Sequence, residues 1–403
     1  MILVLILLFL SIITYPLPDV RIVGQPLAIF LVIFVIIYGA LTKKYRITDK
    51  APIFVLLIFL ISFLITGLIE RDSSNFIEYI INFMSFYLLF LCFSMLSQNS
   101  DKQCTLFFGN RLMYLVILTG IILALYGYYG FFTGNIGTQT SLFWWEEAKY
   151  WGLHYTESTR NSDVHYIAFP FCALLSKENK KWYDNLLLCF FASCLILSMS
   201  RGCWISIITV IMFDQFVLKE KKGRINNILF IIVAAIGGYL LLDYVGMTDY
   251  FLDKINSIFS LSSDNVSNSN NERLAIIAAT LKIFIKHPLG VGGNNLYYYY
   301  KQYGLHLNHA ENSYLNIMTE LGLPAMIGYV VIIAKPLYIG IQCKRRKIDS
   351  QCVNFICLSS LYLLCTSIFN IGLMNCHLWM MIAIVWYVMQ YCRKELDCAD
   401  NTD

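Results

Sequence analysis

Long apolar runs without a single charge recur along this chain, and they constrain its fold more than any other feature. The run at residues 51–69, APIFVLLIFLISFLITGLI, is one of them. About 20 apolar residues in a helix span the hydrocarbon core of a bilayer. Because lipid offers no hydrogen-bond partners, a segment that crosses it must pair its own backbone groups, as a helix does. The sequence therefore predicts an all-α integral membrane protein.

The composition agrees with lipid as the main solvent. Of the 403 residues, 58% are hydrophobic and only 14% are charged, well below the roughly 25% charged residues of an average soluble domain. The net charge is only +4, and the basic residues fall in short clusters between the apolar runs. This pattern argues against nucleic acid as a partner and identifies the clusters as topology signals.

Charge clusters divide the apolar runs into twelve predicted membrane helices. They cover residues 2–17, 23–42, 51–69, 76–97, 112–133, 162–176, 184–200, 203–218, 227–245, 314–339, 353–371 and 376–392. The first run resembles the core of a signal peptide, but it lacks a basic start and a small-residue cleavage site. We therefore interpret it as the first membrane helix.

The chain is accordingly expected to fall into five segments. Residues 1–133 hold helices one to five, 134–163 form a first outer loop, 164–245 hold helices six to nine, 246–313 form a large outer loop, and 314–403 hold helices ten to twelve with a short cytoplasmic tail. Lys and Arg favour the cytoplasmic side of short loops. With both termini in the cytoplasm, nineteen of the thirty Lys and Arg residues lie inside. We expect an inner-membrane protein whose two long loops face outward.

The same topology places every histidine in an outer loop or at an outer helix end. The six are His154, His165, His287, His306, His309 and His377. Since histidine titrates near physiological pH and often transfers protons, we expect the chemistry of the protein to face outward.

The thirteen cysteines do not indicate a disulfide framework. Most lie inside apolar runs, no CxxC pair occurs, and neither long outer loop contains a cysteine. We interpret them as small apolar packing residues and expect neither disulfides in the loops nor a thiolate zinc site.

An amphipathic helix is predicted in the large outer loop. Ser269 to Glu272 has the spacing of a capping box, and apolar residues follow at helical intervals from Leu274 to Ile285. Proline disfavours helix at the residue before it, so the helix should end by His287-Pro288. The glycines that follow permit a tight turn. We expect this helix to lie along the membrane surface.

Arg201 lies in a Ser-Arg-Gly turn between two apolar runs, at the outer apex of a predicted helix hairpin. A charge at such a position is costly unless it is paired. The planar guanidinium suits the oxygens of a phosphate or pyrophosphate. The alternative, which composition supports equally, is that Arg201 snorkels to lipid headgroups.

A second arginine, Arg273, is expected in the first turn of the amphipathic helix, where a positive charge opposes the helix dipole. Either the neighbouring Glu272 or a bound anion would compensate for it. An exposed arginine beside a glutamate is the simpler interpretation, and the two stay open here.

His309, Glu311 and Asn312 cluster where the large outer loop enters the tenth predicted helix. A histidine or carboxylate there could accept a proton from a sugar hydroxyl, provided that its pKa lies near the working pH. Capping of the helix by Asn312 or Ser313 is also expected, and it does not exclude the first role.

Aromatic residues flank these candidates in both outer loops. They lie at residues 143–145, 150–151, 297–300 and 303. Sugar rings stack on such side chains, and an interfacial aromatic belt explains them equally well.

Three blocks of the sequence resemble the O-antigen ligase and polymerase superfamily of bacterial surface-polysaccharide assembly. They are LILSMSRGCW around Arg201, NERLAIIAATLKIFIKHPLGVGGNN at 271–295 and NHAENSYLNIMTELGLPAM at 308–326. Each block alone is weakly specific, but their order and spacing are typical of that family. The likeness covers about residues 160–375.

The resemblance implies a metal-independent glycosyltransferase that needs no cofactor and uses a glycan carried on undecaprenyl pyrophosphate at the outer face of the membrane. By motif, Arg201 and Arg273 correspond to the arginines that hold the pyrophosphate. Glu311 stands where the ligase pattern has its histidine base, and His309 lies two residues earlier, so both are candidates for the catalytic base. Supporting roles are assigned to Arg160, Asn312 and His306.

The favoured function is polymerisation of lipid-linked repeat units into O-antigen, capsule or exopolysaccharide, with a chain-length regulator and a flippase as further partners. A ligase that passes the glycan to lipid A core or another acceptor is the near alternative. A polytopic solute transporter is a more distant one. Transporter sites lie near the bilayer midplane, whereas ionisable residues here, such as Asp214 and Glu320, mostly lie toward helix ends.

Overall fold

A computed structural model describes most of the chain. The described residues are 49–67, 73–99, 102–133, 164–198, 200–219, 264–305, 307, 309–348, 350–369 and 376–400, with a few single positions between 236 and 252. The predicted helices at 2–17 and 23–42, most of 227–245 and the first outer loop lie outside this part, as do the candidate residues Arg160 and His306.

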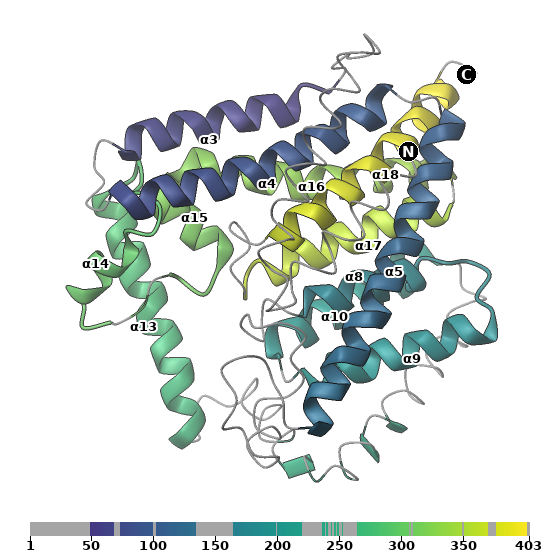
Figure 1. Ribbon diagram of the computed structural model, residues 1–403, viewed down its shortest axis with the longest axis horizontal. Helices are drawn as coiled ribbons and strands as arrows, with labels where there is room; N and C mark the ends of the chain where they lie inside the picture. Colours follow the sequence, from purple (N-terminus) through teal and green to yellow (C-terminus); the bar gives the residue numbers. More distant parts are fainter. Residues whose placement is uncertain are drawn as a thin grey trace.

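The described elements are all helical, with no strand among them (Figure 1). They are α3 (Ala51–Gly67), α4 (Ser73–Asn99), α5 (Lys102–Thr133), α8 (His165–Leu175), α9 (Trp182–Leu197), α10 (Arg201–Phe213), the π-helical turn η2 (Asp214–Leu218), α13 (Asp264–Lys286), α14 (Leu296–Lys301), α15 (Ser313–Leu321), α16 (Leu323–Arg345), α17 (Gln351–Thr366) and α18 (Cys376–Asp400).

Three of these helical stretches are long and apolar enough to cross a membrane: residues 102–129, 201–218 and 323–345. Shorter apolar helices occupy 51–67, 87–98, 165–175, 182–197 and 351–366. Each of them overlaps a helix predicted from the sequence, including 162–176, which is short and contains Pro170. The described part is thus a helical membrane protein, and the total of twelve spans stays a prediction.

Helix α3 shows why lipid is the solvent. Its buried face carries Val55, Phe59 and Phe63, and its opposite face exposes large apolar side chains as well. Those exposed side chains are Phe54, Leu57, Ile61 and Leu64. A helix that is apolar all round is expected in a bilayer.

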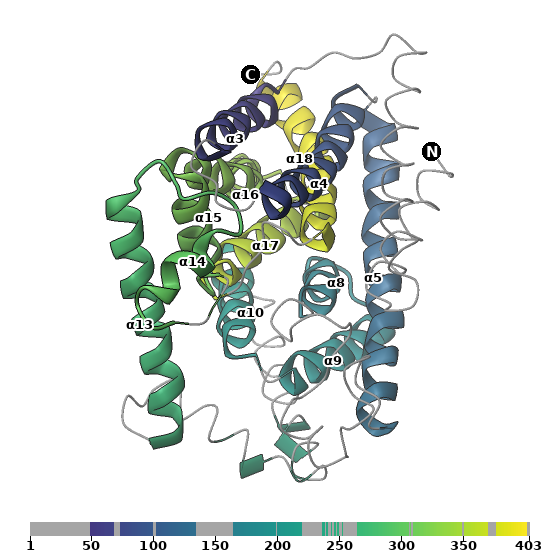
Figure 2. The ribbon, with the colours of Figure 1, turned by 60° about the vertical axis from the view of Figure 1, so that its left-hand side comes forward.

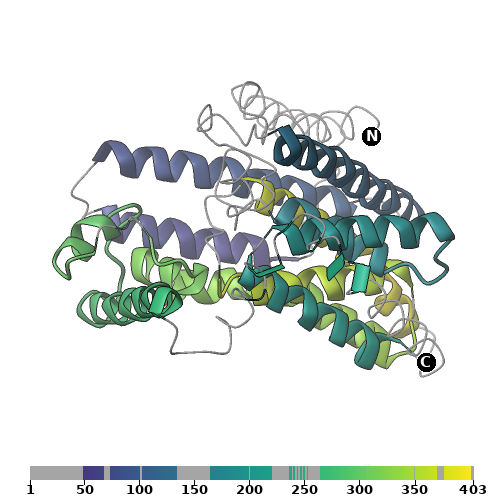
Figure 3. The same cartoon turned by 90° about the horizontal axis from the view of Figure 1, so that it is seen from below.

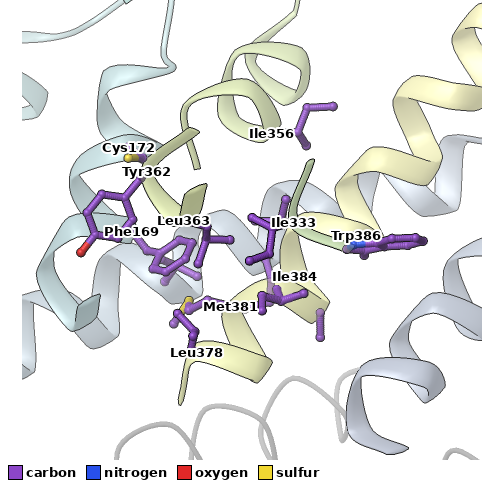
Figure 4. Close-up of a cluster of buried hydrophobic side chains, with 14 of the residues drawn as sticks. Phe169, Cys172, Ile333, Ile356, Tyr362, Leu363, Leu378, Met381, Ile384 and Trp386 are labelled. Carbon is purple, nitrogen blue, oxygen red and sulfur yellow. The ribbon is translucent and has the colours of Figure 1, made fainter. Parts of the chain in front are cut away.

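Aromatic side chains from several helices form the core around α18. Phe83 and Tyr87 of α4 and Tyr329 of α16 contact the ring of Trp379. Deeper in the bundle, Trp386 donates from Nε1 to the Ile332 carbonyl at 2.8 Å, so its buried N–H is paired. Figure 4 shows Trp386 with Ile333 and Ile384 in this core, and Tyr362 beside Phe169 and Cys172 where α17 meets α8.

Helices α13, α14 and α15 gather at one end of the bundle, remote from the C-terminus (Figure 1). Helices α3, α4 and α16 run lengthwise, whereas α13 crosses that direction and is seen nearly end-on in Figure 3. Figure 2 shows α17 between α10 and α15. Because α5, one of the membrane-length helices, crosses the same direction (Figure 1), these orientations do not place α13 relative to a bilayer, and its position along the membrane surface stays a prediction.

Several boundaries differ from the predicted ones. The single helix expected at 314–339 is divided at Gly322, whose φ of +88° places it in the left-handed region. A Cβ there would meet the Leu289 carbonyl oxygen at 3.0 Å, so glycine both permits the turn and lets another segment approach. Helices α5 and α18 are also longer than predicted, because charged residues continue the helix beyond the apolar run.

Candidate functional site

The crosswise helix α13 carries the first site residue. It begins at Asp264, five positions before the predicted capping box, and residues that could cap a helix instead lie within it. The prediction that Arg273 occupies the first turn is therefore wrong, and the argument from the helix dipole does not apply to it. An acidic residue is favourable in the first turn of a helix, which agrees with a start at Asp264. The helix ends at Lys286, just before His287-Pro288, as predicted.

Two apolar faces distinguish α13 from an ordinary surface helix. One face packs Ile276, Ala279 and Ile283 into a small core with side chains of the following turn and α14. That core also contains Val291, Leu296, Tyr299 and Tyr300. The other face exposes Leu274, Leu281 and Ile285, as expected of a helix at a lipid interface.

A glycine-rich turn attaches α13 to the end of α15. The N–H groups of Val291 and Gly292 donate to the carbonyls of Thr319 and Glu320, both at 2.9 Å. Gly290 has a φ of +100°, and a Cβ on it would lie 2.5 Å from the Glu320 carbonyl oxygen. Only glycine accommodates both the conformation and the approach, so this turn fixes where α13 leaves the bundle.

Arg273 meets Glu311 at the entry to α15. The Arg273 Nε lies 3.0 Å from the Glu311 Oε2, with the two side chains 35% and 38% exposed. Glu311 has a φ of +21°, which is uncommon for a residue with a side chain. The next residue, Asn312, caps α15 by accepting from the Leu315 N–H at 3.0 Å, so its predicted capping role is confirmed.

His309 lies two residues before Glu311 and is partly buried. Burial lowers the pKa of its imidazole below the usual 6.5, and the nearby Glu311 carboxylate opposes that shift. The imidazole is therefore neutral at neutral pH. A neutral imidazole can accept a proton, as a base at this position must.

Arg201 is the first residue of α10 and is half-buried. Gly202, beside it, packs closely against Phe369 in the turn that follows α17. In the same turn, the Ser367 carbonyl accepts from the Ser313 N–H at 2.9 Å. One turn of chain therefore joins the Arg201 hairpin to the start of α15. Of the predicted site residues, the structure brings Arg273 and Glu311 into direct contact and connects Arg201 through this turn.

A buried polar network that the sequence analysis did not assign to the site lies beneath these residues. Glu320, 1% exposed, accepts hydrogen bonds from Tyr79, Asn316 and the Asn294 N–H. The sequence offered one signal for this network: Glu320 lies in an apolar helix, and Asn316, four residues before it, lies on the same face. Tyr79 could not be found that way, since it lies 241 residues away in sequence.

Among the described residues, no group of three or more His, Cys, Asp or Glu side chains is arranged to hold a metal ion. The cysteines whose side chains are described are free thiols. The arrangement described above holds the Arg273 guanidinium against the Glu311 carboxylate, and the His309 imidazole, neutral at neutral pH, lies two residues earlier in the chain.

A comparison with protein families finds a match. Residues 186–330 match the family described as O-antigen ligase, so the resemblance seen in the sequence blocks is confirmed over that region. The matched segment runs from α9 to the first turns of α16 and includes Arg201, Arg273, His309 and Glu311. A comparison with curated proteins finds no match. The family supports a glycosyltransferase-type activity on lipid-linked glycans in a bacterial membrane, in the ligase or polymerase manner.

Proposed function

We propose that this chain, with its O-antigen ligase region at 186–330, polymerises surface-polysaccharide repeat units carried on undecaprenyl pyrophosphate. The reaction would take place at the outer face of the inner membrane, with both termini in the cytoplasm. The observation that carries the proposal is the contact between Arg273 and Glu311, 3.0 Å apart at the mouth of α15, within two residues of His309.

Arg273 and Arg201 would bind the donor pyrophosphate. The acceptor hydroxyl attacks the anomeric carbon, the bond from that carbon to the pyrophosphate oxygen breaks, and undecaprenyl pyrophosphate leaves with added negative charge. Guanidinium groups held in place before the reaction stabilise such charge. Loss of one preorganised donor typically costs about 10²- to 10³-fold in rate.

Proton removal from the acceptor hydroxyl falls to His309 or Glu311. His309 is suited to it because burial keeps its imidazole neutral. Glu311 is paired with Arg273, and a pyrophosphate bound to Arg273 would free its carboxylate. Asn312 holds the start of α15, and Arg160 and His306 stay candidates for support.

The exposed end of α14 offers a surface for sugar rings. Tyr298 is exposed there, and Tyr297 packs under the Lys301 ammonium, whose Nζ lies 4.5 Å from the ring centroid. Helix α14, which carries them, lies beside α13, the helix of Arg273 (Figure 1). We propose that they contact the glycan.

The deciding experiment is turnover of an undecaprenyl-pyrophosphate glycan by the purified protein, with and without a chelator. Arg201→Ala, Arg273→Ala and the pair His309→Ala with Glu311→Gln should each abolish product while membrane abundance stays at the wild-type level. Unchanged chain length in one of these variants would remove that residue from the site. Inhibition by the chelator would contradict metal-independent transfer.

The ligase is the second candidate, because the matched family carries that description. A deletion strain separates the two. Products that carry a single repeat unit indicate that a polymerase has been lost. Full-length chains left on the lipid carrier indicate that a ligase has been lost.

A further inference from the structure

The Glu320 side chain lies where three segments meet: α4, α15 and the turn that follows α13. Its Oε2 accepts from the Tyr79 hydroxyl at 2.8 Å and from the Asn316 Nδ2 at 2.9 Å. Its Oε1 accepts from the Asn294 N–H at 3.2 Å. Ionisable side chains inside a membrane bundle are costly and are a default sign of function.

The Asn316 side chain links Glu320 to the chain segment that carries the proposed base. Its Nδ2 donates to Glu320, and its Oδ1 accepts from the Ala310 N–H at 3.1 Å. Ala310 lies between His309 and Glu311. Because Glu320 requires a donor, it sets which end of the Asn316 amide faces Ala310. A flipped amide would direct an NH2 group at the Ala310 N–H, and the hydrogen bond would be lost.

The same carboxylate holds the segment that follows α13. Asn294, with a φ of +62°, donates its N–H to Glu320. Two residues earlier, the Gly292 N–H donates to the Glu320 carbonyl. Glu320 therefore holds both the turn that sets the end of α13, the helix of Arg273, and, through Asn316, the chain beside Glu311.

We infer that Glu320 is a positioning residue, which orders the loop of His309 and Glu311 through the Asn316 amide. The inference rests on the proposed function only in that its turnover assay uses the proposed glycan donor. Shifts of about 1 Å in a reacting group can cost on the order of 10²-fold in rate, so a side chain that touches no substrate can still control turnover.

The test exchanges donors and acceptors without changing shape. Glu320→Gln leaves one amide oxygen where Glu320 has two acceptor oxygens, so its NH2 group must face either the Asn316 Nδ2 or the Asn294 N–H. Asn316→Asp places a carboxylate against Glu320. Each single variant should lower kcat by about 10- to 100-fold, with the KM for the donor changed less than about threefold. In the double variant, the new amide at position 320 donates to the new carboxylate at position 316, and that carboxylate also accepts from the Ala310 N–H. The double variant should recover kcat to within about threefold of the wild type.

Hydrogen exchange of the segment 305–316 gives a readout that needs no substrate. The Ala310 amide should exchange about tenfold faster in Asn316→Asp. In Glu320→Gln, either the Ala310 or the Asn294 amide should do so, and the double variant should restore protection at both. Ile317→Val, buried on the same helix but outside the network, is the matched control and should alter neither readout beyond a small loss of stability. If the single variants do not fold, Tyr79→Phe removes one donor to Glu320 and should give a smaller change in the same direction.

The outcomes separate the two hypotheses. Wild-type kcat and exchange in the single variants, or a double variant no better than either of them, would overturn the positioning role. Changed and restored exchange in a protein that turns over no glycan would overturn the proposed function and leave the positioning role supported.

Discussion

Arg273 and Glu311 form an ion pair, 3.0 Å from Nε to Oε2, in which the carboxylate residue carries a φ of +21°. The two side chains are each about a third exposed, at 35% and 38%. Ion pairs of that kind contribute about 0–1 kcal/mol, whereas a side-chain residue in this backbone region costs about 1–3 kcal/mol. The free energy of the ion pair is therefore smaller than the cost of the backbone conformation at Glu311. The geometry is better explained by a requirement of the site than by stability.

The first prediction concerns competition for Arg273. If Glu311 occupies the anion position of Arg273, Glu311→Gln should bind inorganic pyrophosphate several-fold more tightly than the wild type. Arg273→Ala should bind it at least about tenfold more weakly, by loss of a charge-assisted contact. Titration calorimetry of the purified protein measures both affinities.

Lys282→Ala is the control for this titration, because Lys282 is an exposed cation on the same helix that is not part of the site. It should leave the affinity unchanged. Equal affinities in wild type and Glu311→Gln would show that the carboxylate does not compete.

The second prediction is a pH profile. Burial lowers the pKa of His309 below 6.5. At any pH above that lowered pKa the imidazole is neutral and can accept a proton. If His309 is the base, kcat/KM should fall only on the acid side of 6.5. The Glu311 charge raises the pKa of His309, so Glu311→Gln should move this acid limb to still lower pH.

Rates measured across the acid range in both proteins check this prediction. An acid limb that persists unchanged in His309→Ala would assign the titration to another group. A limb that disappears in Glu311→Gln and persists in His309→Ala would make Glu311 the base.

Local signals in the sequence predicted some boundaries well. The end of α13 at Lys286 and the turn after it follow from Pro288 and the adjacent glycines, whose backbone preferences act at their own positions. The start of α13 was placed five residues late, because a capping-box pattern can equally lie inside a helix when an earlier residue begins it. The division of the predicted helix 314–339 at Gly322 could not be predicted, because a glycine in an apolar run is also tolerated inside a helix.

Contacts across the bundle explain the rest of the difference. The sequence blocks pointed to Arg273 and Glu311 as separate candidates, and the capping role of Asn312 was predicted. Their assembly around Glu320 depends on Tyr79, which belongs to a helix far away in the chain. Periodicity reports which face of a helix is apolar, but it does not report which distant helix that face meets.

The third prediction tests the close approach at the glycine turn. Gly290→Ala strains a φ of +100° and places a Cβ 2.5 Å from the Glu320 carbonyl oxygen. We expect a loss of about 1–3 kcal/mol in unfolding free energy and at least about tenfold slower turnover, because the turn that positions α13 must move. Thermal unfolding in detergent and glycan turnover measure the two effects.

Gly304→Ala provides the matched control. Gly304 has a φ of +72°, but a Cβ there would meet nothing within 4 Å. Its substitution should therefore produce the backbone strain alone, with turnover near the wild-type value. Equal effects in the two variants would show that conformation, and not contact with Glu320, makes Gly290 necessary.

The last prediction concerns the side of the membrane on which this end of the bundle lies. Tyr298 is exposed on α14, and the native Cys398 is exposed near the end of α18, at the opposite end of the bundle (Figure 1). A lipid-linked donor at the outer face requires Tyr298 to be outside. An impermeant maleimide should label Tyr298→Cys, in a Cys398→Ser background, in intact spheroplasts. In the wild type, Cys398 should react only after permeabilisation. The reverse pattern would place Arg273 and Glu311 in the cytoplasm, where the proposed outer-face donor could not reach them.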